Sequence, residues 1–109
     1  MRRGDIVIVV APGDYGKPRP AVVVQADVLT ESGLGSIILC LLSSTLVKSP
    51  LFRLTIKPSS GNGLQKSSQI MVDKLLAVSR DRITEVIGRI NDEQLLQLNR
   101  TLAFVVGIG

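Results

Sequence analysis

The chain has 109 residues, 45% of them hydrophobic, and it carries thirteen Lys and Arg against nine Asp and Glu, for a net charge of +4. It contains no histidine and one cysteine, which excludes zinc sites built from His and Cys, Cys–His nucleophiles and an internal disulfide. The length fits a single domain over residues 1–109. The basic balance favours a polyanionic partner, and any chemistry must come from Arg, Lys, Asp, Glu, Ser, Thr or Tyr.

No apolar run approaches the roughly 20 residues that a membrane-spanning helix needs. The longest, over residues 37–42, has the length of a strand. The basic start of the chain is followed at once by Asp5, so we expect neither a signal peptide nor binding to a membrane. Cys40 lies inside the longest apolar run and is predicted to be a buried structural thiol. Together these features predict a cytoplasmic protein.

Short apolar runs rich in β-branched residues alternate with turn residues, which predicts a mainly β protein with little helix before its C-terminus. The predicted strands cover residues 5–11, 20–27, 36–42, 51–57, 68–73 and 75–79. Loops rich in Pro, Gly and Ser separate them, at 12–18, 31–35 and 58–63. A short helical turn is predicted over 80–86.

A final helix is predicted to begin at Asn91, whose side chain can cap the first free amides while Gln94 reaches back in a capping box. Gly107 can end this helix. Apolar residues at helical spacing form a stripe that we expect to pack on the sheet, namely Leu95, Leu98, Leu102 and Val105 or Val106.

Two of the predicted strands are apolar on both faces, at residues 6–10 and 21–24. In so short a chain, both faces can be covered only if the sheet curls on itself and also meets a helix or a second subunit. We therefore expect a curled sheet and a dimer.

Arg19 and a run of hydroxyls are the first candidates for chemistry. Arg19 lies between two prolines, which restrict its backbone and hold the guanidinium for phosphate binding. Ser43, Ser44 and Thr45 follow a buried strand, where a hydroxyl could bind a phosphate oxygen beside Arg19. The alternatives are a solvated loop arginine and hydroxyls that only satisfy loose backbone groups.

Asp73 and Lys74 lie where one predicted strand gives way to the next. Asp73 could anchor a ribose or a base edge, or it could orient the arginine. The alternative is that the two residues form an exposed ion pair worth less than about 1 kcal/mol.

Four segments, in this order, resemble the MazF/PemK toxins of bacterial toxin–antitoxin pairs: Arg-Gly-Asp-Ile-Val at 3–7, Gly-Lys-Pro-Arg-Pro-Ala-Val-Val-Val at 16–24, Leu-Ser-Ser at 42–44 and Gln-Ile-Met-Val-Asp-Lys at 69–74. The resemblance implies a mainly β (α+β) fold, an SH3-like, CcdB/MazF-type curled antiparallel β-barrel with a C-terminal α-helix. It also implies a homodimer and a cognate antitoxin of the MazE/PemI kind, whose disordered tail masks the RNA groove.

The activity implied by the resemblance is that of an endoribonuclease that cleaves single-stranded RNA or mRNA without a metal or other cofactor and thereby inhibits translation and growth. The ribose 2′-hydroxyl attacks the adjacent phosphate and leaves a 2′,3′-cyclic phosphate and a 5′-hydroxyl. The family's catalytic arginine matches Arg19, its threonine falls at Ser43 or Ser44, and an acidic position matches Asp73. We expect further RNA contacts from Asp14, Tyr15, Lys17, Thr45, Lys48, Gln69 and Lys74.

Two positions depart from the family pattern. Many members carry a Glu-Gln pair in the first loop, where this chain has Asp-Tyr-Gly-Lys at 14–17, and some carry an arginine where this chain has Met71. One alternative is therefore a catalytically weak RNA-binding barrel. Another is a CcdB-like gyrase poison, although the chain contains no tryptophan for the docking tip of such a protein.

Overall fold

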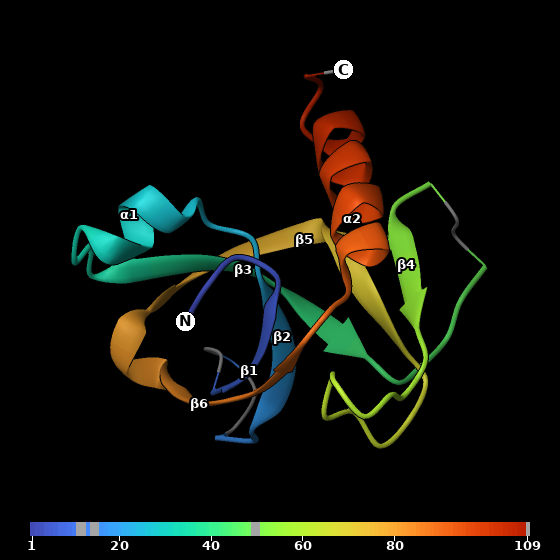
Figure 1. The fold of residues 1–109 in the computed structure, drawn as a ribbon, viewed down its shortest axis with the longest axis horizontal. Coiled ribbons are helices and arrows are strands. Elements are labelled where there is room, and N and C mark those ends of the chain that lie inside the picture. The colour runs from blue at the N-terminus through green and yellow to red at the C-terminus, as the bar shows by residue number, and fades with distance from the viewer. Residues whose placement is uncertain (11–12, 14–15, 49–50, 109) are drawn as a thin grey trace.

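The computed structural model describes residues 1–10, 13, 16–48 and 51–108, which form a six-stranded antiparallel sheet and a long C-terminal helix (Figure 1). The strand order is β4-β5-β3-β2-β1-β6. In chain order the elements are β1 (Asp5–Val9), β2 (Arg19–Val23), α1 (Asp27–Glu31), β3 (Ser36–Ser43), β4 (Arg53–Ile56), β5 (Ser68–Ser79), the 3-10 turn η1 (Arg80–Arg82), β6 (Ile83–Arg89) and α2 (Asp92–Val105). No helix of the described residues is long and apolar enough to cross a membrane.

The predicted strands at 5–11, 20–27, 36–42 and 51–57 correspond to β1 to β4, with ends that differ by a few residues. The two strands predicted at 68–73 and 75–79 are one continuous strand, β5, with an irregular register opposite residues 40–42 of β3. Helix α1 was not predicted from the sequence. The helical turn predicted over 80–86 is wrong beyond η1, because residues from Ile83 onward pair with β1 as strand β6.

The sheet curls as predicted but is not a closed barrel, since β4 and β6 are its two edges and the register contains no pairing between them. The loop between β4 and β5 crosses the gap, where the amide of Arg89 donates to the carbonyl of Gly61 at 3.0 Å. Asn62 is buried in this loop, and its side chain bonds the backbone of Ser59, Leu64 and Lys57 at 2.8–3.1 Å. The buried amide of Asn62 thus fixes the shape of this loop, and the bond from Arg89 to Gly61 joins the loop to the other end of the sheet.

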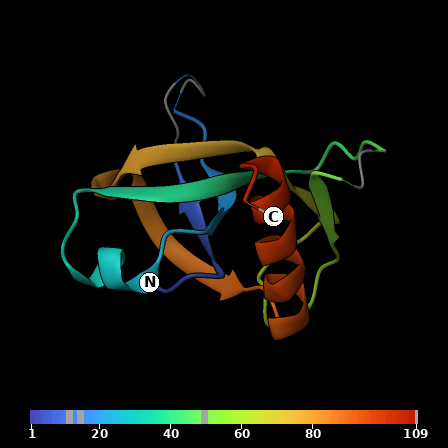
Figure 2. The ribbon, with the colours of Figure 1, turned by 90° about the horizontal axis from the view of Figure 1, so that it is seen from above.

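Both faces of the sheet are apolar, and each is covered in a different way. On one face, α2 lies across the strands (Figure 2), and Leu98 is buried while Leu95, Leu102 and Val105 pack against the same cluster, as the predicted stripe requires. On the other face, side chains of β1, β2, β3, β6 and the end of β5 meet one another in a second cluster, which comprises Val7, Val9, Ala21, Val23, Ile37, Leu39 and Val78 with Leu41, Leu76 and Ile83 at its border. Strands that are distant in the sheet order can share a cluster only because the sheet curls.

The start of α2 has the predicted capping box. The amide of Gln94 donates to Oδ1 of Asn91 at 2.8 Å, and the amide of Asn91 donates to Oε1 of Gln94 at 2.9 Å. At the other end, Gly107 follows the helix with a φ of +78°, a backbone conformation that favours glycine. These signals define where α2 begins and ends.

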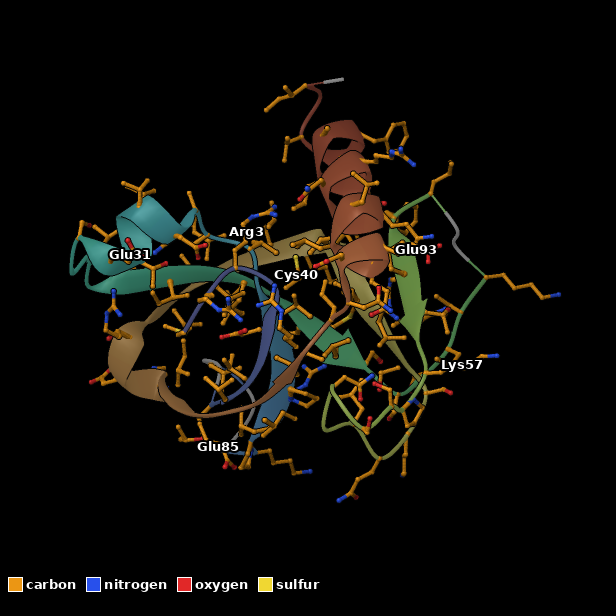
Figure 3. The ribbon with its side chains drawn as sticks, in the orientation of Figure 1. Arg3, Glu31, Cys40, Lys57, Glu85 and Glu93 are labelled. Carbon is orange, nitrogen blue, oxygen red and sulfur yellow. The ribbon has the colours of Figure 1, made fainter. Side chains whose placement is uncertain are left out.

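Cys40 is fully buried in the cluster beneath α2, near the middle of the molecule (Figure 3). Burial, with a smaller contribution from the carboxylate of Asp73, raises the pKa of the thiol from 9.0 to about 12, against the opposing effect of Arg3. The thiol is therefore protonated at neutral pH, and its predicted structural role is confirmed.

We predict that Gly63→Ala destabilises the protein by about 3 kcal/mol, because Gly63 has a φ of +70° and an added Cβ would lie 2.4 Å from the carbonyl oxygen of Ile87 in β6. Gly33→Ala is the matched control. Its φ is +86° with nothing within 4 Å of the added Cβ, so it should cost only about 1 kcal/mol. Urea unfolding measures both, and equal losses would contradict the role given to this contact between loop and strand.

Candidate active site

The start of β2 and the end of β3 lie side by side, because the two strands run antiparallel with Ala21 opposite Leu41. A pocket of about 420 Å³ opens there. We call it the Arg19 pocket. It is lined by Arg19, Pro20, Leu42, Ser43, Ser44, Thr45, Leu64, Gln65, Lys66 and Ser68. Figure 1 shows β3 ending beside the long loop that joins β4 to β5, which supplies the far wall.

Arg19 is the first residue of β2, where its backbone pairs with Val9 of β1. The side chain is half-buried, and its Nη2 donates to the carbonyl oxygen of Leu42 at 3.3 Å. The guanidinium is thus directed from β2 toward the end of β3, while the flanking prolines restrict the backbone that carries it.

The three hydroxyls at the end of β3, on its last residue Ser43 and on Ser44 and Thr45 after it, line the same pocket. Oγ of Ser43 accepts a hydrogen bond from the amide of Thr45 at 3.1 Å, which turns the chain sharply at the strand end. Ser44 lies at the tip of this turn and is exposed. Both serines considered for the family threonine therefore reach the pocket, Ser43 as part of the turn and Ser44 from its tip.

The sequence did not predict one wall of the pocket, which is formed by Leu64, Gln65, Lys66 and Ser68. Ser68 begins β5, and it lies beside the end of β3 because Ser43 pairs with Gln69. The loop at 58–63 was predicted, but only the pairing of β3 with β5 shows that its far end returns to the Arg19 pocket. The sequence signal that could have found these residues is a lysine among hydroxyls just before a strand.

The charges of the pocket suit an anion. Two cations, Arg19 and Lys66, line it together with four hydroxyls and one amide, and none of its described lining residues is acidic. An arginine offers two parallel donors to phosphate oxygens, and hydroxyls add further donors. A phosphate with a sugar attached would find donors on two sides of this pocket and apolar contacts from Pro20, Leu42 and Leu64.

The other predicted site residues lie in several places. Lys17, Lys48 and Lys74 are exposed, on the loop before β2, the loop after β3 and the middle of β5 respectively. Gln69 is buried next to the pocket, with 6% of its surface exposed. Asp14 and Tyr15 lie outside the described residues.

Asp73 is not among the residues that line the Arg19 pocket; its carboxylate lies 3.7 Å from Nε of Arg53. Arg53 comes from β4 and stands directly opposite Met71 of β5. An arginine is therefore present beside Asp73, although it comes from the neighbouring strand and not from position 71.

The Arg-Gly-Asp segment near the N-terminus has structural contacts. Nε of Arg3 donates to the carbonyl of Val24 at 2.9 Å, and its Nη1 donates to the side chain of Asn99 in α2 at 2.5 Å. The carboxylate of Asp5 pairs with Arg89 of β6 at 2.9 Å. This segment therefore joins the N-terminus to the helix and to the edge of the sheet, away from the Arg19 pocket.

The sequence pattern of the PemK-like, MazF-like toxins of type II toxin–antitoxin systems matches residues 2–106 of the chain. The chain is 35% identical over 109 residues to a probable endoribonuclease MazF of Mycolicibacterium smegmatis strain ATCC 700084 / mc(2)155, an alignment that covers 99% of this chain and 98% of the relative.

Solved structures have the same fold. An endoribonuclease in complex with its cognate antitoxin, from Mycobacterial species, superposes with a TM-score of 0.84 at 16% identity, covering 100% of this chain and 97% of that one. The Mycobacterium tuberculosis toxin MazF-mt6 gives 0.81 at 16% identity over 96% and 98% of the two chains. MazE–MazF from Deinococcus radiodurans gives 0.78 at 20% identity over 100% and 98%. The chain therefore belongs to the PemK-like, MazF-like family of toxins of type II toxin–antitoxin systems.

Proposed function

We propose that this protein is an endoribonuclease toxin that cleaves single-stranded RNA in the Arg19 pocket. The observation that carries the proposal is the meeting of Arg19, Lys66 and the hydroxyls at the end of β3 in one pocket whose described lining is free of carboxylates. Membership of the family and the naming of a relative as a probable endoribonuclease support the same activity and favour it over gyrase poisoning.

In the proposed reaction, the ribose 2′-hydroxyl gives its proton to solvent water and its oxygen attacks the adjacent phosphorus. The bond to the 5′-oxygen breaks, and that oxygen takes up a proton, so the products are a 2′,3′-cyclic phosphate and a 5′-hydroxyl. The guanidinium of Arg19 stabilises the negative charge that builds up on the phosphate oxygens and is the candidate donor to the leaving oxygen. A hydroxyl of Ser43 or Ser44 holds a non-bridging oxygen, and Asp73 orients RNA outside the pocket.

Metal independence is part of the proposal. The chain has no histidine, and its one cysteine is buried beneath α2. The positive charge that a metal ion would bring to the phosphate can come from Arg19 and Lys66, which already line the pocket.

The named relatives also suggest a biological setting. Solved structures with the same fold hold an endoribonuclease with its cognate antitoxin and MazF with MazE. We propose that a MazE/PemI-like antitoxin binds this chain and masks its RNA groove. Released from it, the toxin would cut mRNA in the cytoplasm and so inhibit translation and growth.

A homodimer is the proposed assembly, supported by apolar side chains that α2 leaves uncovered. Leu75 of β5 lies opposite Cys40 and so faces the same side of the sheet as α2, and Ile38 shares that face two residues along β3. Their exposed fractions are 39% and 38%. Phe104 and Ile108 add exposed apolar surface at the C-terminal end of α2. A second copy of the chain could cover this face.

We predict that the purified protein cleaves a long single-stranded RNA in EDTA and that Arg19→Ala slows cleavage by at least about 100-fold, since it removes the main charge that stabilises the transition state. Arg100→Ala, which removes an exposed arginine of α2, is the matched control and should leave the rate unchanged. Mapping of the fragments should give 5′-hydroxyl and cyclic phosphate ends, and Ser43→Ala and Ser44→Ala then identify which hydroxyl takes part.

Two results would contradict this proposal. RNA that is bound by the folded protein but left intact would indicate a binding barrel without turnover. Cleavage that stops in EDTA and returns with added Mg²⁺ would reject the metal-free mechanism.

We predict that Leu75→Glu converts the dimer to a monomer, because a buried carboxylate without a partner is costly at an apolar interface. Light scattering after size-exclusion chromatography should show a mass near 11.7 kDa for the variant and about twice that for the wild type. Val86→Glu, on edge strand β6 and 49% exposed, is the control that should remain dimeric. A wild-type protein of monomer mass would rule out this assembly.

A further inference from the structure

We propose that Gln69 is a positioning residue of the active site, which fixes the segment after β3 and thereby places the hydroxyls of Ser44 and Thr45 opposite Arg19. This inference rests on the proposed function. It replaces the RNA contact that the sequence suggested for Gln69 with an action through the protein backbone.

The side-chain amide of Gln69 forms a reciprocal pair of hydrogen bonds with one residue of that segment. The amide of Val47 donates to Oε1 of Gln69 at 3.0 Å, and Nε2 of Gln69 donates to the carbonyl of Val47 at 2.9 Å. Nε2 also lies 3.3 Å from Oγ1 of Thr55 in β4. A side chain thus supplies the donor and the acceptor that a neighbouring strand would otherwise offer to the backbone.

The segment at 44–48 depends on this contact. Its residues are exposed and belong to neither β3 nor β4. Within the described part of the chain, the two bonds between Val47 and Gln69 are the hydrogen bonds that tie residues 44–48 to a distant part of the fold, since the bonds of Thr45 are to its near neighbour Ser43.

Burial and register explain why Gln69 can act in this way. Only 6% of Gln69 is exposed, and both ends of its amide are engaged, so contact with RNA would require breaking existing bonds. Gln69 pairs with Ser43 across β3 and β5, whereas its neighbour Ser68 lines the pocket. Because directly paired residues lie on the same face of a sheet, the side chain of Gln69 starts beside Ser43, from which residues 44–48 continue to Val47.

Removal of the Gln69 amide is expected to misplace the hydroxyls of Ser44 and Thr45 relative to the phosphate without weakening the binding of RNA. A hydroxyl that hydrogen-bonds a phosphate oxygen must be held within a fraction of an ångström, and a misplacement of about 1 Å can cost about 100-fold in rate. Without the amide of Gln69, Val47 loses two hydrogen bonds and the loop that carries Ser44 and Thr45 loses its attachment to β5. Arg19, on β2, keeps its position.

The test compares Gln69→Leu, which removes both hydrogen-bonding ends, with Gln69→Glu, which keeps the acceptor for the amide of Val47. Thr55→Val is the control, since it removes only the 3.3 Å contact to Nε2. On a short RNA that contains the cleavage site, we expect Gln69→Leu and Gln69→Glu each to lower kcat by about 10- to 100-fold, since the carboxylate of the second variant would face the carbonyl oxygen of Val47, and Thr55→Val to stay within about twofold. The Kd for the same RNA with a 2′-O-methyl group at the scissile nucleotide should change by less than about threefold in each variant.

A weaker Kd with an unchanged kcat would overturn the inference and restore direct contact between Gln69 and RNA. Hydrogen exchange of the Val47 amide supplies a readout that needs no activity. It should be at least about 10-fold faster in Gln69→Leu than in the wild type, while the amide of Ile56 in β4 keeps its rate. If the wild type cleaves no RNA, the proposed function fails. Hydrogen exchange alone then tests whether Gln69 holds the loop, and an unchanged exchange rate of the Val47 amide in Gln69→Leu would reject that role.

Discussion

The pairing of β3 with both β2 and β5 is the constraint on which the candidate site depends. β3 lies between these strands in the sheet, so its C-terminal end meets the start of β2 and the start of β5. Arg19 is the first residue of β2, three hydroxyls lie at the end of β3, and Ser68 is the first residue of β5. Residues that are up to 49 positions apart in the sequence, from 19 to 68, therefore line one pocket because of antiparallel register alone.

The same strands are apolar on both faces, and this determines the rest of the architecture. One face folds against itself and the other receives α2, which covers Leu42 and Cys40 but leaves Ile38 and Leu75 exposed. Between the two edges of the sheet, the loop around Asn62 bonds to β6, so the wall that carries Gln65 and Lys66 is attached to a fixed structure. The loop between β4 and β5 therefore has two roles. It bridges the open side of the sheet, and its far end forms one wall of the Arg19 pocket.

Much of this could be read from the sequence. Apolar runs and turn residues predicted β1 to β5, and Asn91 with Gln94 predicted the start of α2, because these signals are local. β6 was missed since its residues are half-exposed and follow an apparent helical turn, and only pairing with β1 makes them a strand. Arg19 was predicted as a site residue from the two prolines beside it, and the hydroxyls were predicted from the apolar strand that precedes them. Lys66 and the contact from Gln69 to Val47 depend on strand register and burial, which no local pattern of a single sequence contains.

The central claim is that the Arg19 pocket is where the scissile phosphate of RNA binds, and NMR titration tests it most directly. An RNA oligonucleotide with a 2′-O-methyl group at the scissile position would be added to ¹⁵N-labelled protein. If the phosphate binds there, the largest shifts fall on the amides of residues 19, 42–45, 64–66 and 68, which line the pocket. Shifts concentrated instead at a separate hollow between the loop before β5 and the start of α2, formed by Ser59, Gly61, Arg89, Ile90, Asn91, Asp92 and Gln94, would contradict it.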